Sequence, residues 1–272
     1  MTALEQFLSE QACDGLLSWS AQCAAAERFG VSCARVEETI LQLGIMPYRY
    51  QRNRQTISVE GQQRLFRSRV VVVGCGGLGG YVIEILARLG VGNLVAIDPD
   101  VFEEHNLNRQ ILSSITRVGQ PKVEAAAARV AEINPAVTLT PVRACWRPED
   151  GKRILERADA VVDALDSKPA RLALAATCSA IGVPFVHGAI AGWYGQAATQ
   201  FPGDSIMERI YRSSAQEKGV EQRLGNPAFT PAIVAGLQTA EVCKIILGAG
   251  NALRKRLVFV DLLEMTFQTL EL

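Results

Sequence analysis

The sequence predicts an α/β protein with a Rossmann-like, mostly parallel sheet, helices on both faces, a C-terminal antiparallel extension and a small N-terminal helical appendage. Two observations predict this class. From Arg69 onward, short β-branched runs alternate with stretches of helical length, which is typical of βαβ units. The preceding region carries mainly helical patterns. We therefore expect two domains, an appendage at residues 1–47 and a larger α/β domain at residues 48–272.

The appendage is expected to contain helices near residues 4–9, 20–29 and 32–43. Ser32 suits an N-cap, and Gly44 suits a helix stop. The last two helices have helix-turn-helix spacing, but no cluster of Lys or Arg marks the second one for DNA phosphates. We therefore favour a packing or docking role over nucleic-acid binding.

The larger domain begins with a β-branched run at residues 70–73, which suits a strand buried on both faces of a parallel sheet. Further strands are expected at residues 93–97, 137–142, 160–162 and 184–186. Helices are expected between them at residues 78–89 and from Pro121 to the break at Asn134-Pro135. This order predicts crossover connections over both faces of the sheet.

The C-terminal region follows another pattern. After a helix at residues 231–247, the segments 257–261 and 265–270 alternate apolar and polar residues, which predicts a closing antiparallel hairpin. Residues 201–229 are polar, charged and long for a connection, which is typical of a disordered or a functional segment. Their charges serve either to guide a partner or only to face solvent.

Composition excludes several function classes. The 28 basic and 28 acidic residues cancel, so no global charge attracts nucleic acid or an anionic membrane. The seven cysteines contain no CxxC pair, which is typical of reduced thiols in the cytoplasm. We see neither a secretion signal nor a membrane span, and we expect a cytoplasmic protein.

The segment after the first strand is rich in glycine and opens a helix. Gly74, Gly76, Gly77 and Gly79 let the backbone turn sharply and approach a phosphate closely, and the helix N-terminus supplies free N–H groups. We therefore expect a nucleotide phosphate at this loop. The alternative is a tight turn without a ligand.

An acidic residue ends the second strand. Asp98 lies about twenty positions beyond the glycine loop, where a carboxylate accepts hydrogen bonds from ribose hydroxyls. Asp100 follows it and is a second candidate for nucleotide contact. These features fit ATP and NAD equally, so a dehydrogenase stays possible at this point.

The residues that follow favour ATP. The loop after the second strand contains Asn106, Asn108, Arg109 and Gln110, and Lys122 directly follows Pro121, where the next helix is expected to start. A lysine in a first helical turn opposes the helix dipole at a cost of up to about 1 kcal/mol, which a polyphosphate would offset. Arg109 and Lys122 could neutralise the charge that develops as pyrophosphate leaves. The alternative for Lys122 is a solvated surface lysine.

Two carboxylates bracket the end of a later strand. Open α/β sheets place ligands at the carboxyl ends of parallel strands, and a carboxylate there can hold Mg²⁺ against phosphate oxygens. We expect Asp166 to hold the magnesium ion, and Asp163 to cap the turn or the next helix.

Together these motifs resemble the ThiF/MoeB/HesA adenylyltransferases, bacterial relatives of ubiquitin-activating enzymes. The resemblance runs from about Arg49 to the C-terminus. It rests on Arg54-Gln55, the Gly-Cys-Gly-Gly-Leu-Gly loop, Asp98-Pro99-Asp100, Asn108-Arg109-Gln110, Gly119-Gln120-Pro121-Lys122, Ile133-Asn134-Pro135 and Asp166.

The resemblance implies a reaction in which ATP adenylates the C-terminal glycine carboxylate of a ubiquitin-like sulfur carrier and pyrophosphate leaves. It implies catalytic roles for Arg109, Lys122 and Asp166. It also implies that Arg54 reaches the phosphates of the other subunit, so a homodimer is expected.

The chain departs from the family in its cysteines. Many relatives carry two CxxC pairs for zinc, which needs four soft ligands, and this chain has none, so no zinc is expected. His105 and His187 are too far from any cysteine pair to replace that site, and we expect a structural role for His187. Residues 201–229 contain no cysteine for a covalent intermediate. We therefore expect the reaction to stop at the adenylate, with a separate sulfur donor.

Three alternatives remain open from the sequence. An NAD-dependent oxidoreductase shares the glycine loop and Asp98, but it leaves Arg109, Lys122 and Asp166 without a role. A related enzyme could adenylate a non-protein carboxylate. A nucleotide-sensing regulator would use residues 1–47. The sequence also leaves open whether the carrier serves thiamine, a molybdenum or tungsten cofactor, or another sulfur pathway.

Overall fold

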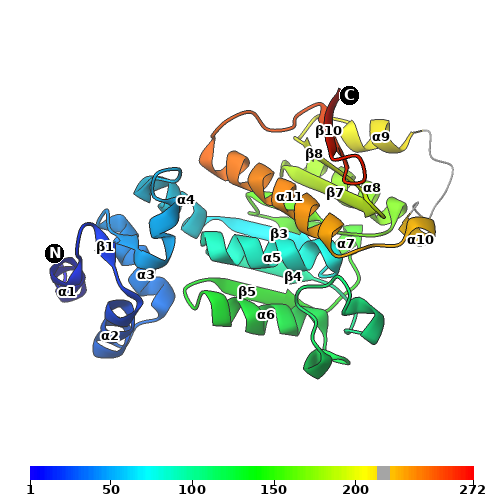
Figure 1. Cartoon of the computed structure of the whole chain (residues 1–272). Coiled ribbons are helices and arrows are strands. Elements are labelled where there is room, and N and C mark those ends of the chain that lie inside the picture. The colour runs from blue at the N-terminus through cyan, green and yellow to red at the C-terminus, as the bar shows by residue number, and fades with distance from the viewer. Residues whose placement is uncertain (213–220) are drawn as a thin grey trace.

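The computed structural model describes residues 1–212 and 221–272 of the chain, and its centre is an eight-stranded sheet (Figure 1). Five neighbouring strands run parallel, and three C-terminal strands continue the sheet in antiparallel fashion. In sheet order the strands are β10 (Thr266–Glu271), β9 (Arg256–Asp261), β8 (Tyr194–Gln200), β7 (Phe185–Ala191), β6 (Ala160–Asp163), β3 (Arg69–Val73), β4 (Asn93–Ile97) and β5 (Thr138–Val142). The predicted fold class is confirmed.

Strand β3 is the middle of the parallel region. Val71 pairs with Val95 of β4 and with Val161 of β6, and the four valines of β3 are almost fully buried. Val70 and Val72 belong to the core on one face of the sheet, and the alternating Val71 and Val73 belong to the core on the other face. Each buried valine is worth about 1.5–3 kcal/mol relative to an exposed one.

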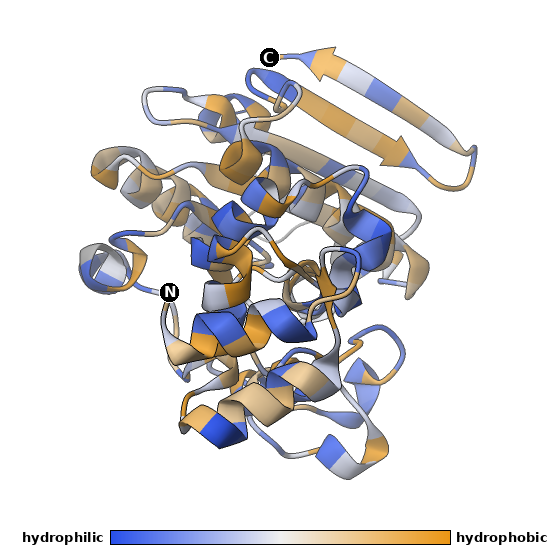
Figure 2. Ribbon diagram, turned by 90° about the vertical axis from the view of Figure 1, so that its left-hand side faces the viewer, coloured by the Kyte–Doolittle hydropathy of each residue, from blue (hydrophilic) through white to orange (hydrophobic). Residues whose placement is uncertain are grey.

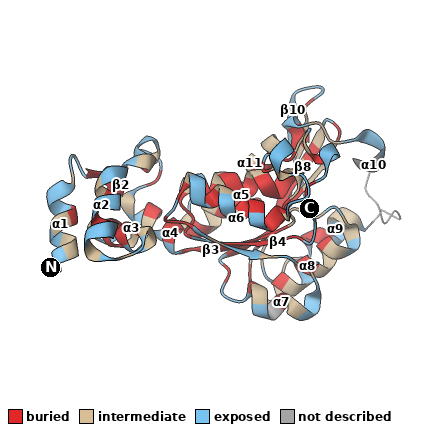
Figure 3. Cartoon of the chain, turned by 90° about the horizontal axis from the view of Figure 1, so that it is seen from below, coloured by how far each residue is buried: buried red, intermediate tan, exposed pale blue. Residues whose placement is uncertain are grey.

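Helices cover both faces, as Figure 3 shows. On one face lie α5 (Gly77–Leu89), α6 (Lys122–Ile133) and α11 (Phe229–Leu247). On the other lie α7 (Pro148–Leu155), α8 (Lys168–Ile181) and α9 (Ile206–Tyr211). The three helices of the first face were predicted from the sequence. Helix α7 on the other face was not predicted, because its segment is short and highly charged.

Helix α11 has the length and the apolar composition of a membrane span. It packs against α5 and β7, and Val234, Ala235 and Val242 of this helix are fully buried in the core of the domain. Its composition is therefore explained by burial inside the protein.

The C-terminal part contains one strand that the sequence did not predict. The predicted hairpin of β9 and β10 is present, and it lies at the C-terminal edge of the sheet (Figure 2). The predicted alternation is incomplete along β10, because two polar residues separate its apolar residues Phe267 and Leu270. Strand β8 lies between this hairpin and β7, so the antiparallel region has three strands. Of the predicted segment 201–229, α9 and the short α10 (Glu221–Leu224) are described. The charged residues Glu217 and Lys218, whose role the sequence left open, lie outside the described residues.

The appendage contains the three expected helices, α1 (Ala3–Gln11), α2 (Trp19–Phe29) and α3 (Cys33–Gln42). The Ser32 hydroxyl accepts the N–H of Arg35 at 3.2 Å, as an N-cap does. Two unpredicted short strands, β1 (Leu16–Leu17) and β2 (Met46–Pro47), pair in parallel beside a small apolar core. The 3₁₀ helix η1 (Tyr48–Asn53) and helix α4 (Val59–Arg67) then lead into β3, so the appendage lies where β3 begins (Figure 1).

A buried polar cluster joins the appendage to the larger domain. Glu37 of α3 is fully buried, accepts the Tyr50 hydroxyl at 2.8 Å and pairs with Arg49. Asn134, at the end of α6, accepts Arg49 at 2.8 Å and donates to the Tyr50 hydroxyl at 2.7 Å. Burial raises the pKa of Glu37, and Arg49 opposes that rise. The cluster is therefore stable only while every member keeps its partners.

We predict that Glu37→Ala lowers the free energy of unfolding by about 3 kcal/mol, because it leaves the Arg49 charge without its buried partner. The measurement is chemical denaturation followed by circular dichroism. The neighbouring Glu38→Ala is the control, since Glu38 is partly exposed and its surface ion pair is worth at most about 1 kcal/mol. Equal losses in both variants would contradict the assigned role of the cluster.

Candidate active site

The glycine loop joins β3 to α5. At two of its positions the backbone is packed so closely that only glycine fits. Gly74 has a φ of +97°, and a Cβ there would lie 2.5 Å from the Ala164 carbonyl oxygen. A Cβ on Gly79 would lie 1.8 Å from the carbonyl oxygen of Gly74. The first turn of α5 therefore packs directly on the end of β3, and its N–H groups are available to an anion.

A cavity of about 530 Å³ opens above this loop, at the carboxyl ends of β3, β4 and β6. The sequence-predicted residues that line it are Gly74, Gly76, Gly77, Asp98, Asp100, Asn106, Arg109, Gln110, Lys122 and Asp166. Residues that are separated by up to about ninety positions in the sequence are thus assembled in one site, as expected for the strand ends of an open α/β sheet.

Asp98 holds two loops together. One carboxylate oxygen accepts the N–H of Cys75 at 2.6 Å, and the other accepts the N–H of Asp100 at 2.8 Å. Burial raises the pKa of Asp98, while the Cys75 N–H and Lys122 lower it. The carboxylate therefore stabilises the two loops. The ribose contact predicted for Asp98 stays a prediction.

Lys122 is a buried cation at the start of α6. Pro121 is the N-cap and Lys122 the first helical residue, one position later than the sequence predicted for the helix start. Only 7% of Lys122 is exposed, and its ammonium group pairs with the Asp100 carboxylate at 3.0 Å. Asp100 thus offsets part of the cost of placing this charge at a helix N-terminus. The solvated lysine that the sequence left open is excluded by this burial.

Arg109 lies beside the glycine loop, and its Cγ would be 3.9 Å from a Cβ on Gly77. The guanidinium donates to the His105 carbonyl at 3.1 Å and to the Asn108 side-chain oxygen at 2.9 Å. Asn108 is not among the residues that line the cavity, and its predicted contact with the nucleotide stays a prediction. Its amide group donates to the carbonyl of Asn226 at 3.2 Å, so Asn108 orients Arg109.

Gly79 also contributes indirectly. It lies beneath the loop rather than on the cavity wall, and its role is the close packing of α5 on β3. Its predicted contact with the nucleotide stays a prediction.

Asp166 faces the cavity from the loop after β6. It is exposed, and the structure gives it no hydrogen-bond or ion-pair partner within residues 1–212 and 221–272. Asp163, the last residue of β6, lies three positions earlier and is fully buried. It accepts the N–H of Leu165 at 3.0 Å, which is the turn role predicted for it. His187 donates to or accepts from Asp163 at 2.7 Å, and burial lowers the pKa of this histidine.

The residues present fit ATP with Mg²⁺. The cavity has the size of a nucleotide site, and its cations and helix N-terminus match a polyphosphate. Gln110 is buried, and its side-chain oxygen lacks a hydrogen-bond partner within the described part of the chain. Within that part, no group of three His, Cys, Asp or Glu side chains could hold a metal, so phosphate oxygens would complete any Mg²⁺ site at Asp166. The predicted absence of zinc stays a prediction.

Arg54 lies apart from this cavity. It follows η1, and its guanidinium donates to the carbonyl of Asp14 in the appendage at 3.0 Å. The structure therefore does not bring Arg54 to the glycine loop of its own chain.

Several lining residues were missed by the sequence analysis. Trp146 and Cys145 come from the segment after β5, Asn226 from the loop before α11, and Arg171 from the second turn of α8. Arg171 had a usable signal, because it follows Asp166 closely and puts a second cation near a helix N-terminus. The other three lie in segments without a recognisable pattern.

A second cavity of about 510 Å³ adjoins the first and shares Asp166, Arg171 and Ile190 with it. Most of its surface is apolar. Its apolar side chains include Ile190, Tyr194, Ile210, Tyr211, Leu224 and Phe259. The nucleotide-sized cavity therefore opens directly into an apolar groove.

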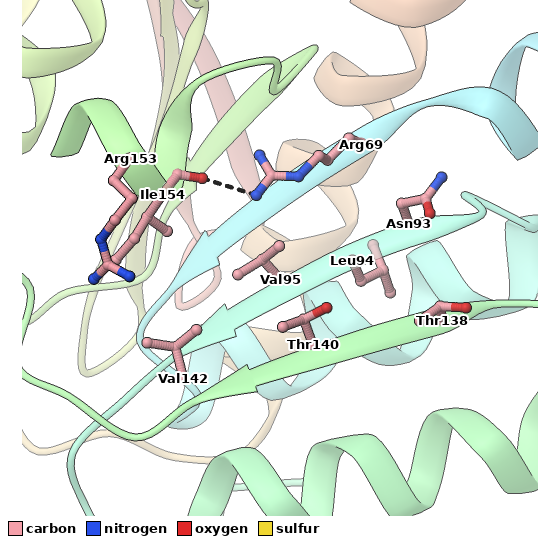
Figure 4. Close-up of a pocket in the computed structure, with 9 residues that line it drawn as sticks. All are labelled: Arg69, Asn93, Leu94, Val95, Thr138, Thr140, Val142, Arg153 and Ile154. Atoms are coloured by element: carbon pink, nitrogen blue, oxygen red, sulfur yellow. Dashed lines mark hydrogen bonds between the residues drawn. The ribbon is translucent and has the colours of Figure 1, made fainter. Parts of the chain in front are cut away.

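A smaller cavity of about 240 Å³ lies on the sheet face formed by β3, β4 and β5 (Figure 4). The Arg69 guanidinium there donates to the carbonyls of Ile154 and Glu156, and Arg153 pairs with Asp150. Since both cations already have protein partners, this cavity offers no comparable anion site.

The cysteines give no reactive thiol in the core. Burial raises the pKa of Cys178 to about 12 and that of Cys243 to about 11, and it raises the pKa of Cys75 in the glycine loop. These thiols are protonated at neutral pH and are poor nucleophiles.

Fold and cavity together define a nucleotide-binding α/β enzyme that has cations and a carboxylate around a phosphate loop. Residues 48–272 match the ThiF family, and the chain belongs to this family. The resemblance predicted from the sequence motifs and the adenylyltransferase class are thereby confirmed.

Named relatives agree with this class. The chain is 43% identical to the SAMP-activating enzyme E1 of Haloferax volcanii, over 78% of this chain and 80% of that protein. It is 36% identical to the sulfur carrier protein adenylyltransferase of Thermus thermophilus, over 79% and 82%. It is 34% identical to the molybdopterin-synthase adenylyltransferase of Escherichia coli, over 81% and 91%.

Solved structures agree in fold. The structure of Escherichia coli MccB with ATP matches 92% of this chain and 82% of that chain, with a TM-score of 0.71 and 24% identity. At this identity the match supports the fold alone. Because it covers most of the chain, it extends into the appendage.

We predict that Gly79→Ala weakens ATP binding by at least about 100-fold, because the added methyl group would displace the carbonyl of Gly74 and open the phosphate loop. Isothermal titration calorimetry measures the change. Gly236→Ala in α11 is the matched control, since its methyl group would meet no atom within 4 Å. We expect this control to bind ATP normally and to gain about 0.5–1 kcal/mol of stability. Normal ATP binding by Gly79→Ala would contradict the assigned loop.

Proposed function

We propose that the chain activates the C-terminal glycine carboxylate of a ubiquitin-like sulfur carrier protein. A carboxylate oxygen of the carrier attacks the α-phosphorus of ATP, the bond from that phosphorus to the bridging oxygen breaks, and an acyl-adenylate and pyrophosphate are formed. The observation that carries the proposal is the assembly of Arg109, Lys122 and Asp166 around one glycine loop. The named relatives at 34–43% identity support the carrier as the substrate class.

The residues of this site have distinct tasks in the proposed reaction. The N–H groups at the start of α5 hold a phosphate, and Arg109 and Lys122 stabilise the charge that grows on the departing pyrophosphate. Asp98 and Asp100 bind the ribose side of the nucleotide, and Gln110 and Asn106 contact it from the loop after β4. Asp166 would hold Mg²⁺, which neutralises phosphate charge when it is bound.

The apolar groove supports an extended peptide as the acyl substrate. It meets the nucleotide-sized cavity at Asp166, Arg171 and Ile190, where a terminal carboxylate could reach the α-phosphate. A flexible C-terminal tail would lie along the groove, and glycine at its end would place no side chain at the junction of the two cavities.

We further propose a homodimer in which Arg54 acts on the nucleotide of the partner subunit. The distance of Arg54 from its own cavity, and its place on an exposed loop, support an action in trans. The cytoplasm is the proposed compartment, because seven unpaired cysteines are typical of a reducing environment.

The proposed reaction ends at the acyl-adenylate, and sulfur comes from a separate donor protein. The raised pKa values of the buried Cys178 and Cys243 support this limit, since neither thiol suits an attack on the adenylate. The NAD-dependent alternative receives no support from the named relatives, and adenylation of a non-protein carboxylate is an outcome of the first test below.

We predict that carrier-dependent exchange of pyrophosphate into ATP falls about 10²–10³-fold in Arg109→Ala, because a preorganised charge is lost from the transition state. The assay uses radiolabelled pyrophosphate, Mg²⁺ and candidate ubiquitin-like carriers. Arg117→Ala is the control, since Arg117 donates to the Leu112 carbonyl outside the cavity, and it should keep the activity of the unmodified protein. If pyrophosphate exchange needs a small carboxylate and no carrier protein, the substrate is that small carboxylate and the proposed carrier is wrong. Full exchange in Arg109→Ala would refute the assigned role.

We predict that Arg54→Ala and Arg109→Ala complement each other. Each variant alone should be inactive, but a heterodimer would contain one intact site. Random assembly of equal amounts should therefore restore about a quarter of the unmodified activity. Co-expression with two affinity tags and the exchange assay measure this recovery. Absence of recovery in isolated heterodimers would show that Arg54 does not act across the dimer.

A further inference from the structure

Arg171 occupies the junction between the two cavities, and the assigned chemistry does not yet use it. Only 7% of this residue is exposed, and it lines both the nucleotide-sized cavity and the apolar groove. It lies in the second turn of α8, where a cation opposes the helix dipole. A buried arginine at such a place needs specific partners to offset its desolvation.

Within the described part of the chain, the guanidinium has partners on three segments. It donates to the carbonyl of Leu165 after β6, to the carbonyl of Gly188 in β7 at 3.0 Å and to the Tyr211 hydroxyl of α9 at 3.2 Å. The Asp163 carboxylate lies 3.8 Å from it. The planar, multiply donating guanidinium can satisfy these acceptors together, which an ammonium group cannot do.

Leu165 is held from both sides. Its N–H donates to the Asp163 carboxylate at 3.0 Å, and its carbonyl accepts from Arg171. Asp163 is itself fixed, because His187 bonds its other oxygen at 2.7 Å and Gln238 bonds its main-chain carbonyl at 2.8 Å. Both polar backbone groups of the residue directly before Asp166 are therefore immobilised.

We propose that Arg171 is a positioning residue that aims the Asp166 carboxylate into the nucleotide cavity for a divalent metal ion. It acts through Leu165, and it is anchored by the carbonyl of Gly188 and by the hydroxyl of Tyr211, which lies on the wall of the apolar groove. This inference rests on the metal role given to Asp166 in the proposed function. Asp166 has no protein partner of its own within the described residues, so only the backbone before it can set its direction.

Arg171→Lys tests the proposal, because lysine keeps the charge but cannot bridge three acceptors. We expect binding of Mn²⁺ to the protein–ATP complex, measured by electron paramagnetic resonance, to weaken about tenfold, as is usual when the residue that orients a metal ligand is lost. ATP binding in the presence of EDTA should stay unchanged. In the exchange assay, the lost activity should return when the Mg²⁺ concentration is raised about tenfold.

Arg64→Lys is the matched control. Arg64 also donates to two main-chain carbonyls, those of Ile246 and Leu247, but it lies outside both cavities. This variant should leave Mn²⁺ binding unchanged. If Arg171→Lys fails to fold, Arg171→Gln replaces it with the same expectation, since its amide group can hold only one of the carbonyls.

Unchanged Mn²⁺ affinity in the folded Arg171 variant would overturn the inference. Equal weakening of Mn²⁺ binding and of metal-free ATP binding would also overturn it, because a general loss of structure affects both. The measurement needs no carrier protein. The Mn²⁺ binding measurement therefore remains informative even if the unmodified protein lacks carrier-dependent exchange. That lack of exchange would refute the proposed function but not this inference.

Discussion

The nucleotide site depends on one close packing contact, that between the first turn of α5 and the carboxyl end of β3. The Cα of Gly79 lies so near the carbonyl oxygen of Gly74 that no side chain fits between them. This contact points the N-terminus of α5 at the cavity and sets the floor against which the cations act. Because β3 is also the middle strand of the parallel region, the register of β4 and β6 fixes where Asp98 and Asp166 stand relative to that floor.

Around this floor, the charged side chains are arranged in two ways. Asp98, Lys122 and Arg171 are buried and have protein partners, so their positions are set before any ligand arrives. Asp166 is exposed and, among the described residues, has no partner, so it is free to take a ligand. Three fixed charges therefore surround the Asp166 carboxylate, which is available to a ligand. This arrangement is typical of a site in which electrostatic preorganisation supplies most of the rate enhancement.

Sequence patterns predicted the elements whose signal is local. The valine run of β3, the glycine loop and the hairpin of β9 and β10 each follow from a few adjacent residues, and the structure contains all three. Motif position did not tell that Asn108 and Gly79 lie off the cavity wall. Strand β8 forms a hairpin with β7 through a two-residue turn at Gly192 and Trp193, a local signal that the sequence analysis missed. The junction role of Arg171 depends on contacts between segments far apart in the chain, and such contacts leave no periodic signal.

The appendage and the active site lie at opposite ends of the same sheet, yet they are mechanically linked. Arg49 and Tyr50, next to the loop that carries Arg54, are held by Glu37 of α3 and by Asn134 at the end of α6. The appendage also contacts Arg54 itself through the Asp14 carbonyl. The role proposed for Arg54 in a partner subunit requires that this residue be presented at a defined place on the surface, and a flexible terminus could not do this at low entropic cost. The contacts of the appendage with Arg49, Tyr50 and Arg54 hold the loop that carries Arg54 in place.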